Sequence, residues 1–115
     1  MALTIAEDQR NGVTILKLSG RLVLGQESNE FRNTVKRLLD AGDNKILVDL
    51  GEVGYIDSAG LGTLVSGFTS ARNSGGVMKL ANLTKKFHEQ LSITKLVTVF
   101  DVYNSVEEAV KSFTA

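Results

Sequence analysis

The chain has 115 residues, 43% of them hydrophobic, and its 13 basic and 13 acidic residues give no net charge; this length predicts one domain, spanning residues 1–115, with its own hydrophobic core. A neutral chain with few aromatic residues lacks the basic stripe and the stacking platform of nucleic-acid binders. Because it has no cysteine, no apolar run near the ~18 residues of a membrane span and no recognisable signal peptide, we expect a cytoplasmic protein without a membrane partner.

The chain opens with a predicted β-hairpin, which a helix follows. Leu3 to Gln9 and Val13 to Ser19 are strand-like, and the Asn11-Gly12 pair between them suits a type I′ turn. Gln26 to Ala41 has the spacing of an amphipathic helix, and Gly42 then supplies a stop signal. The hairpin predicts one antiparallel strand pair in the sheet.

The second part of the chain alternates between strands and helices. Lys45 to Leu50 is a short, nearly continuous apolar run, which is typical of a strand covered on both faces. The elements predicted after it are a helix at Ser58–Ser74, a strand at Val77–Ala81, a helix at Thr84–Leu91, a strand at Leu96–Phe100 and a last helix opened by the capping box Ser105–Glu108. The order β-β-α-β-α-β-α-β-α predicts an α/β fold with a mostly parallel mixed sheet and about four helices.

Ser58 occupies the place where the buried strand should turn into the second helix. In sheets of this kind functional residues gather at the carboxyl ends of the strands. Backbone N–H groups in a first helical turn lack intrahelical partners and lie at the positive end of the dipole, so a phosphate on Ser58 would be accepted there. No acid follows Ser58 in that turn, whereas Asp57 can cap the helix and would repel a phosphate. In isolation an Asp-Ser pair is more often a plain helix cap than a switch.

The helix after Ser58 is unusually rich in small residues. Each glycine in a helix interior costs roughly 1 kcal/mol relative to alanine, and glycine there usually lets another group approach closely. Opposite the apolar stripe, the predicted outward face consists of Ala59, Gly62, Thr63, Ser66, Gly67 and Ser70. Two explanations remain open: a smooth surface on which another protein docks, or packing under a neighbouring segment of the same domain.

The segment Asp57-Ser58-Ala59-Gly60-Leu61-Gly62, preceded by the strand ending Val48-Asp49-Leu50, resembles the signature of STAS-domain anti-sigma-factor antagonists. The resemblance extends over nearly the whole chain and includes Ser19-Gly20-Arg21-Leu22 and Gly75-Gly76. It implies a STAS fold in which Ser58 is the phosphorylation site. It also implies that the unphosphorylated form binds a serine-kinase anti-sigma factor and so frees a sigma factor. Phosphorylation then ends the complex, and a serine phosphatase restores it.

In the family the loop after the second strand helps to form the partner surface, and here it corresponds to Arg21 to Gln26. The expected partner-binding residues are Arg21, Leu22, Val23, Leu24 and Gly25 of this loop together with Asp57, Ser58, Ala59, Gly60, Gly62, Thr63, Ser66, Gly67 and Ser70 of the helix. Many members have an acidic residue where this chain has Val23, which leaves the identity of the partner open. The family also includes scaffold proteins of signalling complexes, so a constitutive binding module without phosphorylation is the alternative.

An enzyme is the alternative from a different class, and the sequence argues against it. Ser58 is placed like the serine of a G-x-S-x-G nucleophile elbow, but Ile56 stands where the first glycine should be. A serine hydrolase also needs a base, and the only histidine, His88, lies on a predicted short helix and is most simply a solvated surface residue. We therefore expect no catalytic residues.

Cofactor sites are no better supported. Gly60-Leu61-Gly62 lacks both the G-K-[ST] of a P-loop and the spacing of a dinucleotide-binding loop. Asp49, Glu52 and Asp57 are three acids near one strand end, but they are more simply a cap and solvated loop charges. The sequence therefore predicts neither a cofactor nor a metal.

Overall fold

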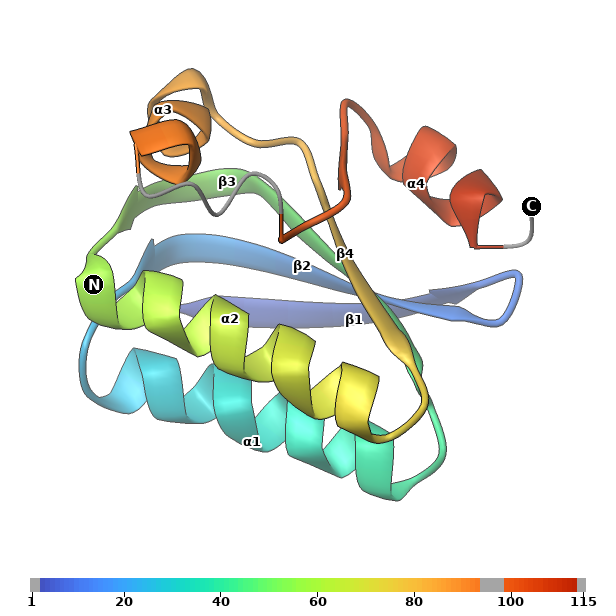
Figure 1. Cartoon of the computed structure of the whole chain (residues 1–115). Helices are drawn as coiled ribbons and strands as arrows, with labels where there is room; N and C mark the ends of the chain where they lie inside the picture. Colours follow the sequence, from blue (N-terminus) through green and yellow to red (C-terminus); the bar gives the residue numbers. More distant parts are fainter. Residues whose placement is uncertain (1–2, 94–98, 114–115) are drawn as a thin grey trace.

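The computed structural model describes residues 3–93 and 99–113. Its strands form one five-stranded sheet in the order β1-β2-β3-β4-β5 (Figure 1). β1 pairs antiparallel with β2, and the other neighbouring strands pair in parallel. The predicted α/β class, element order and mixed sheet are confirmed. The elements are β1 (Thr4–Arg10), β2 (Val13–Leu22), α1 (Gln26–Asp40), β3 (Lys45–Ile56), α2 (Ser58–Asn73), β4 (Val77–Ala81), α3 (Lys85–Ile93), β5 (Val102–Tyr103) and α4 (Val106–Ser112).

The hairpin and the helix ends form for the reasons the sequence suggested. Asn11 and Gly12 both have positive φ, 53° and 80°, as the two central residues of a type I′ turn require. Gly42, at φ 88°, ends α1 in a left-handed conformation. At the start of α4 the Ser105 hydroxyl accepts a hydrogen bond from the backbone N–H of Glu108 at 3.1 Å.

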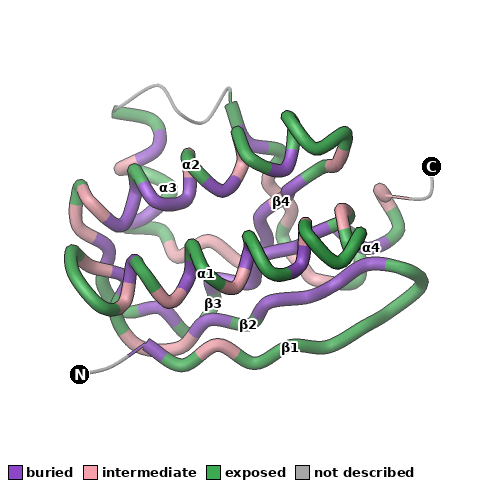
Figure 2. The backbone as a smooth tube through the Cα atoms, turned by 90° about the horizontal axis from the view of Figure 1, so that it is seen from below, coloured by how far each residue is buried: buried purple, intermediate pink, exposed green. Residues whose placement is uncertain are grey.

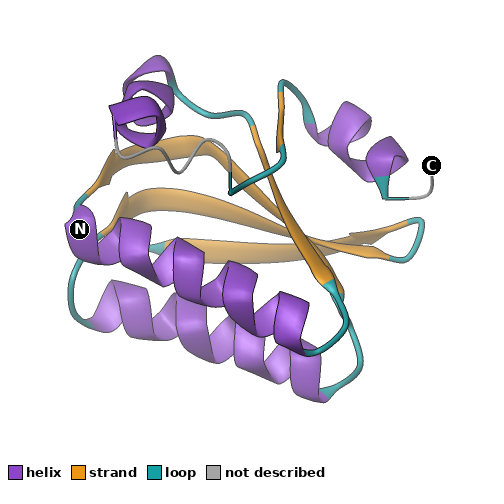
Figure 3. Cartoon of the chain, in the orientation of Figure 1, coloured by secondary structure: helices purple, strands orange, loops and turns teal. Residues whose placement is uncertain are grey.

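The helices divide between the two faces of the sheet. α1 and α2 lie side by side across one face, and α4 lies on the opposite face (Figures 1 and 3). The main core lies under α1 and α2 and includes Phe31, Leu64 and the inward side chains of α3, Phe87 and Leu91. A smaller core joins α4 to the other face through Ala109 and neighbouring strand residues. Figure 2 shows buried positions along β2 and β3, whereas β1 is exposed over most of its length.

Two strands are longer than predicted. β2 continues through Leu22 and β3 continues through Ile56, so that Leu22 pairs with Ile56. The ladder between them shifts register twice, which accommodates extra residues in β3 near Gly51 and Gly54. The predicted strand ended at Leu50, where the continuous apolar run stops, whereas in the structure Gly51 and Gly54 accompany bulges within β3.

The last predicted strand, Leu96–Phe100, is only partly testable. Residues 96–98 lie outside the described residues, and the prediction is wrong for Val99 and Phe100, which form a turn and a bend. Phe100 is buried and packs edge-on against the ring of Phe68, with 5.4 Å between the ring centroids. An apolar residue at this position therefore reflects burial in the core and not a strand. The strand in this region is the short β5, which pairs with the end of β4.

Candidate functional site

Asp57 and Ser58 mark the point where β3 ends and α2 begins. Asp57 is the N-cap, and its Oδ1 accepts a hydrogen bond from the backbone N–H of Gly60 at 2.7 Å. Ser58 is the first helical residue and is exposed. Capping is therefore performed by Asp57, so the structure does not need the Ser58 hydroxyl for that purpose.

The other carboxylate oxygen of Asp57 reaches a second part of the chain. Its Oδ2 accepts a hydrogen bond from the backbone N–H of Leu24, at 3.0 Å, in the loop between β2 and α1. The hydrogen bond from Gly60, and then that from Leu24, lower the pKa of Asp57 below its ordinary value of 3.8. One ionised side chain thus joins the start of α2 to the loop for which the family resemblance implies a partner surface.

The loop from Arg21 to Gln26 presents some of its predicted residues and hides others. Leu24 is 76% exposed, and Gly25 adopts a φ of 108° that side chains rarely tolerate. Val23 is half-buried, and its carbonyl accepts a hydrogen bond from the Ser28 hydroxyl at 2.7 Å. The prediction that Leu22 contacts a partner is wrong, because this residue belongs to β2 and its side chain is fully buried in the core.

The predicted small face of α2 divides into two parts. Gly62, Ser66 and Ser70 are exposed and Ala59 is half-buried, so four of the six predicted residues reach the surface. A side chain added at Gly62 would meet nothing within 4 Å. Ser66 and Ser70 line a groove of about 340 Å³ between α1 and α2.

The placement of Thr63 and Gly67 on the outward face is wrong. Thr63 is 0% exposed, and its hydroxyl donates to the carbonyl of Ala59 at 2.9 Å. A Cβ at Gly67 would lie 3.2 Å from the ring of Phe31 on α1. Gly67 is small because Phe31 of α1 and Met78 of β4 approach α2 closely on that side, which is the packing explanation left open by the sequence.

Gly60, also predicted to bind a partner, is buried for a related reason. A Cβ at this position would overlap the carbonyl oxygen of Leu22 at the end of β2. The glycine therefore lets the second strand approach the first turn of α2. It supports the candidate site from below and does not form its surface.

Two of the three acids considered as metal ligands, Asp49 and Asp57, have other roles. Asp49 is 9% exposed and accepts hydrogen bonds from the Gly51 backbone at 3.0 Å and from the Asn82 side chain at 3.1 Å. Both oxygens of Asp57 are engaged as described above. Over residues 3–93 and 99–113, no group of three or more His, Cys, Asp or Glu side chains could hold a metal ion. The same part of the chain contains no helix with the length and apolar character needed to cross a membrane.

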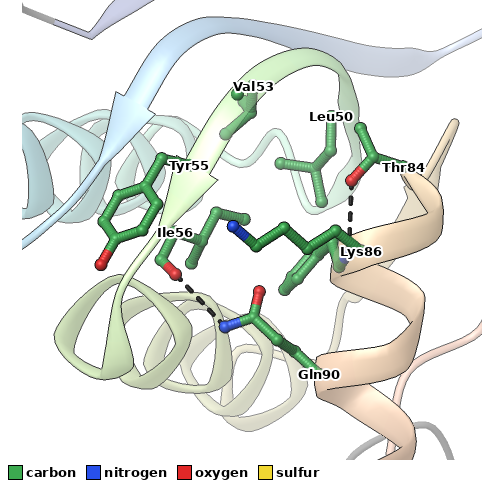
Figure 4. A pocket seen from close by; sticks show the side chains of 9 residues that line it. Leu50, Val53, Tyr55, Ile56, Thr84, Lys86 and Gln90 are labelled. Atoms are coloured by element: carbon green, nitrogen blue, oxygen red, sulfur yellow. Dashed lines mark hydrogen bonds between the residues drawn. The ribbon is translucent and has the colours of Figure 1, made fainter.

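Sequence reasoning missed an aromatic residue beside the motif. Tyr55, near the end of β3, is 44% exposed, and two cations lie near its ring, one of which, Lys86, is drawn in Figure 4. They are Arg21 of β2 and Lys86 of α3. Gln90 of α3 donates a hydrogen bond to the carbonyl of Ile56 at 3.3 Å, which holds α3 against this edge. Tyr55 follows a bulge in β3, and it pairs with Arg21 only because the register of the β2–β3 ladder shifts there. This shift is the signal that the sequence interpretation missed.

Comparison with known proteins assigns the fold and the motif to one family. The STAS domain model matches residues 4–109, and the chain belongs to the STAS domain family. A candidate anti-sigma factor antagonist of Thermotoga maritima is 36% identical over 73 residues, which cover 64% of this chain and 65% of that protein. BtrV, a candidate anti-sigma factor antagonist of Bordetella bronchiseptica, is 29% identical over 113 residues, covering 98% of this chain and 95% of BtrV. The anti-sigma-B factor antagonist of Bacillus subtilis is 36% identical over 62 residues, which cover 54% of this chain and 57% of that protein.

A solved structure agrees with this assignment. The crystal structure of a candidate anti-sigma factor antagonist from Thermotoga maritima superposes with a TM-score of 0.89 at 28% identity. The superposition covers 96% of this chain and 95% of that one. The resemblance inferred from the Asp57–Gly62 motif is therefore confirmed at the level of the family and of the whole fold.

Proposed function

We propose that this STAS domain is a phosphorylation-switched protein-binding module of the cytoplasm. Its unphosphorylated form binds a serine-kinase anti-sigma factor and frees a sigma factor. Phosphorylation of Ser58 ends the binding, and a serine phosphatase restores it. The domain itself performs no catalysis in this scheme. The names of its relatives as anti-sigma factor antagonists support the kind of partner.

The observation that carries the proposal is the exposed Ser58 beside the capping carboxylate of Asp57. Because Asp57 accepts the hydrogen bond from Gly60, the Ser58 hydroxyl is not needed to cap α2 and can be modified without unwinding the helix. The same carboxylate holds the backbone of Leu24 at Asp57, the residue before the serine. A kinase that recognises the loop would therefore find the serine at a fixed position relative to it.

The physical basis of the switch is the cost of burying a charge. The partner surface in this proposal consists of the exposed residues Arg21, Leu24, Gly25, Ser58, Gly62, Ser66 and Ser70 and the half-buried Val23, Asp57 and Ala59. A phosphate on Ser58 adds about −1.5 to −2 charges to a contact made for a neutral hydroxyl. Desolvating an unpaired charge costs several kcal/mol, so we expect the affinity to fall about a hundredfold or more.

Intact mass and peptide mapping test the proposal. The protein is incubated with ATP and the serine-kinase anti-sigma factor of the same organism, with the Ser58→Ala variant as the matched control. One phosphate on Ser58, none on the variant, and weaker kinase binding by the phosphorylated form are the expected results. Stable binding without any phosphate would instead identify a constitutive module, and labelling of another residue would refute the assignment of Ser58.

A further inference from the structure

Two cations converge on one exposed aromatic ring at the edge of the sheet. The Cζ atom of Arg21 lies 5.3 Å from the centroid of the Tyr55 ring, and Nζ of Lys86 lies 5.6 Å from the same centroid. Arg21 faces Tyr55 across the β2–β3 ladder, and Lys86 reaches the ring from α3 (Figure 4). Three separate elements thus contribute to one surface, which we call the Tyr55 patch and define as Arg21, Tyr55 and Lys86.

The charges of this patch are not neutralised within the described part of the chain. Ion pairs there involve Arg10, Lys36, Arg37 and Lys111, and neither Arg21 nor Lys86 takes part in one. Asp57, two residues after Tyr55, directs its carboxylate oxygens to the backbone of Gly60 and Leu24. Two like charges drawn to the same ring repel each other, so an anion placed between them would stabilise the arrangement.

We infer that the Tyr55 patch binds an acidic segment of a protein partner. A carboxylate would pair with the Arg21 guanidinium, a second carboxylate would pair with Lys86, and the ring of Tyr55 would supply apolar contact. This inference rests on the proposed function in that both require a protein partner and both place Arg21 on the binding surface, and it adds the chemistry of the partner's surface.

The surroundings of the patch favour a protein over a free anion. Tyr55 itself is 44% exposed, so apolar area lies next to the charges, and Leu24, three residues after Arg21, is 76% exposed. A free phosphate would leave that area in contact with water, whereas a protein segment would cover it. The patch also lies near the proposed switch along the chain, since Ser58 is three residues after Tyr55.

A titration that needs no identified partner tests the inference. Backbone amide resonances of the ¹⁵N-labelled protein are followed at low ionic strength during addition of a hexaglutamate peptide. We expect saturable shifts in residues 19–24, 53–58 and 84–90, and their loss in the double variant Arg21→Glu/Lys86→Glu. The control variant Lys45→Glu/Arg72→Glu makes the same change in charge at two exposed positions, at the start of β3 and near the end of α2, which are the ends away from Tyr55 and Ser58. This variant should keep the shifts. Shifts spread over the whole surface, or equal shifts in both double variants, would overturn the inference.

Two further results separate the alternatives. If inorganic phosphate at equal ionic strength produces the same shifts with the same affinity as the peptide, the patch is a site for free anions and the inference of a protein partner is wrong.

With the serine-kinase anti-sigma factor, we expect the Arg21→Glu/Lys86→Glu variant to associate about tenfold more slowly, with a weaker dependence on salt. Unchanged association would overturn the assignment of the patch while leaving the proposed function standing. A kinase that binds neither protein would refute the proposed function, and the peptide titration would still decide the inference.

Discussion

The carboxylate of Asp57 and the backbone N–H of Leu24 are hydrogen-bonded at 3.0 Å although 33 residues separate them in the chain. The same carboxylate caps α2 through Gly60. The position of the β2–α1 loop therefore depends on the residue next to Ser58. A change of charge at Ser58 would therefore act first on Asp57 and then, through the hydrogen bond to Leu24, on the loop. The loop and the start of α2 are the two segments that bind one partner in the proposed function.

Replacing Asp57 by asparagine should loosen this connection. The asparagine side chain has one acceptor oxygen, so only one of the N–H groups of Leu24 and Gly60 keeps its partner, and the other faces an NH₂ group. We expect a lower thermal midpoint than in the wild type, with amide resonances shifting at Leu24 and along the loop. Ser58→Ala is the control, because it removes a neighbouring polar group without touching the carboxylate. An unchanged Leu24 resonance in Asp57→Asn would contradict the role given to this hydrogen bond.

The same contact predicts a pH dependence of stability. The folded state lowers the pKa of Asp57 below 3.8, since the N–H groups of Gly60 and Leu24 favour the ionised form. The resulting stabilisation is fully present above pH 3.8 and is lost as the pH falls through the lower, folded-state pKa. Chemical denaturation of the wild type and of Asp57→Asn should therefore show a stability difference that is constant near neutral pH and shrinks below pH 3.8. A difference that persists unchanged in acid would show that Asp57 does not act through its charge.

Two glycines of α2, two residues apart, should respond in opposite ways to alanine. A Cβ at Gly60 overlaps the backbone of Leu22, so Gly60→Ala must displace either the end of β2 or the helix. We expect a loss of roughly 1–3 kcal/mol in the free energy of unfolding, measured by urea denaturation. Gly62 has open space around it, so Gly62→Ala should gain up to ~1 kcal/mol from helix propensity. Equal effects of the two substitutions would mean that the close approach of Leu22 does not constrain the helix.

These glycines also show what the sequence could and could not predict. Periodicity and turn residues located the helices and most of the strands, because those signals are local. The apolar stripe of α2 was also recognised, and the small residues opposite it were assigned to the outward face from their helical spacing. Thr63 is instead fully buried, and Gly60 and Gly67 lie where β2 and α1 approach the helix closely. That distance depends on how the elements pack, and no local pattern encodes it.

The Tyr55 patch was missed for a comparable reason. The predicted third strand ended at Leu50, where the continuous apolar run stops, before Gly51 and Gly54. In the structure they accompany two register shifts, and the strand continues until Tyr55 faces Arg21. Pairing across a bulged ladder is a property of two strands together, so it could not be predicted from either strand alone.

The last prediction separates the exposed face of α2 from its core. Gly62→Arg should fold normally, because the position is exposed and a side chain there meets nothing within 4 Å. In a packed contact the same arginine would clash and bring an unpaired charge into a dry interface, so kinase binding should be lost. Leu64→Ala should behave in the opposite way, since Leu64 is 0% exposed. It should lose ~2–5 kcal/mol of stability through a cavity and bind normally while folded. Circular dichroism melts and calorimetric titration with the kinase measure both properties. A folded Gly62→Arg variant that binds as tightly as the wild type would remove α2 from the partner surface.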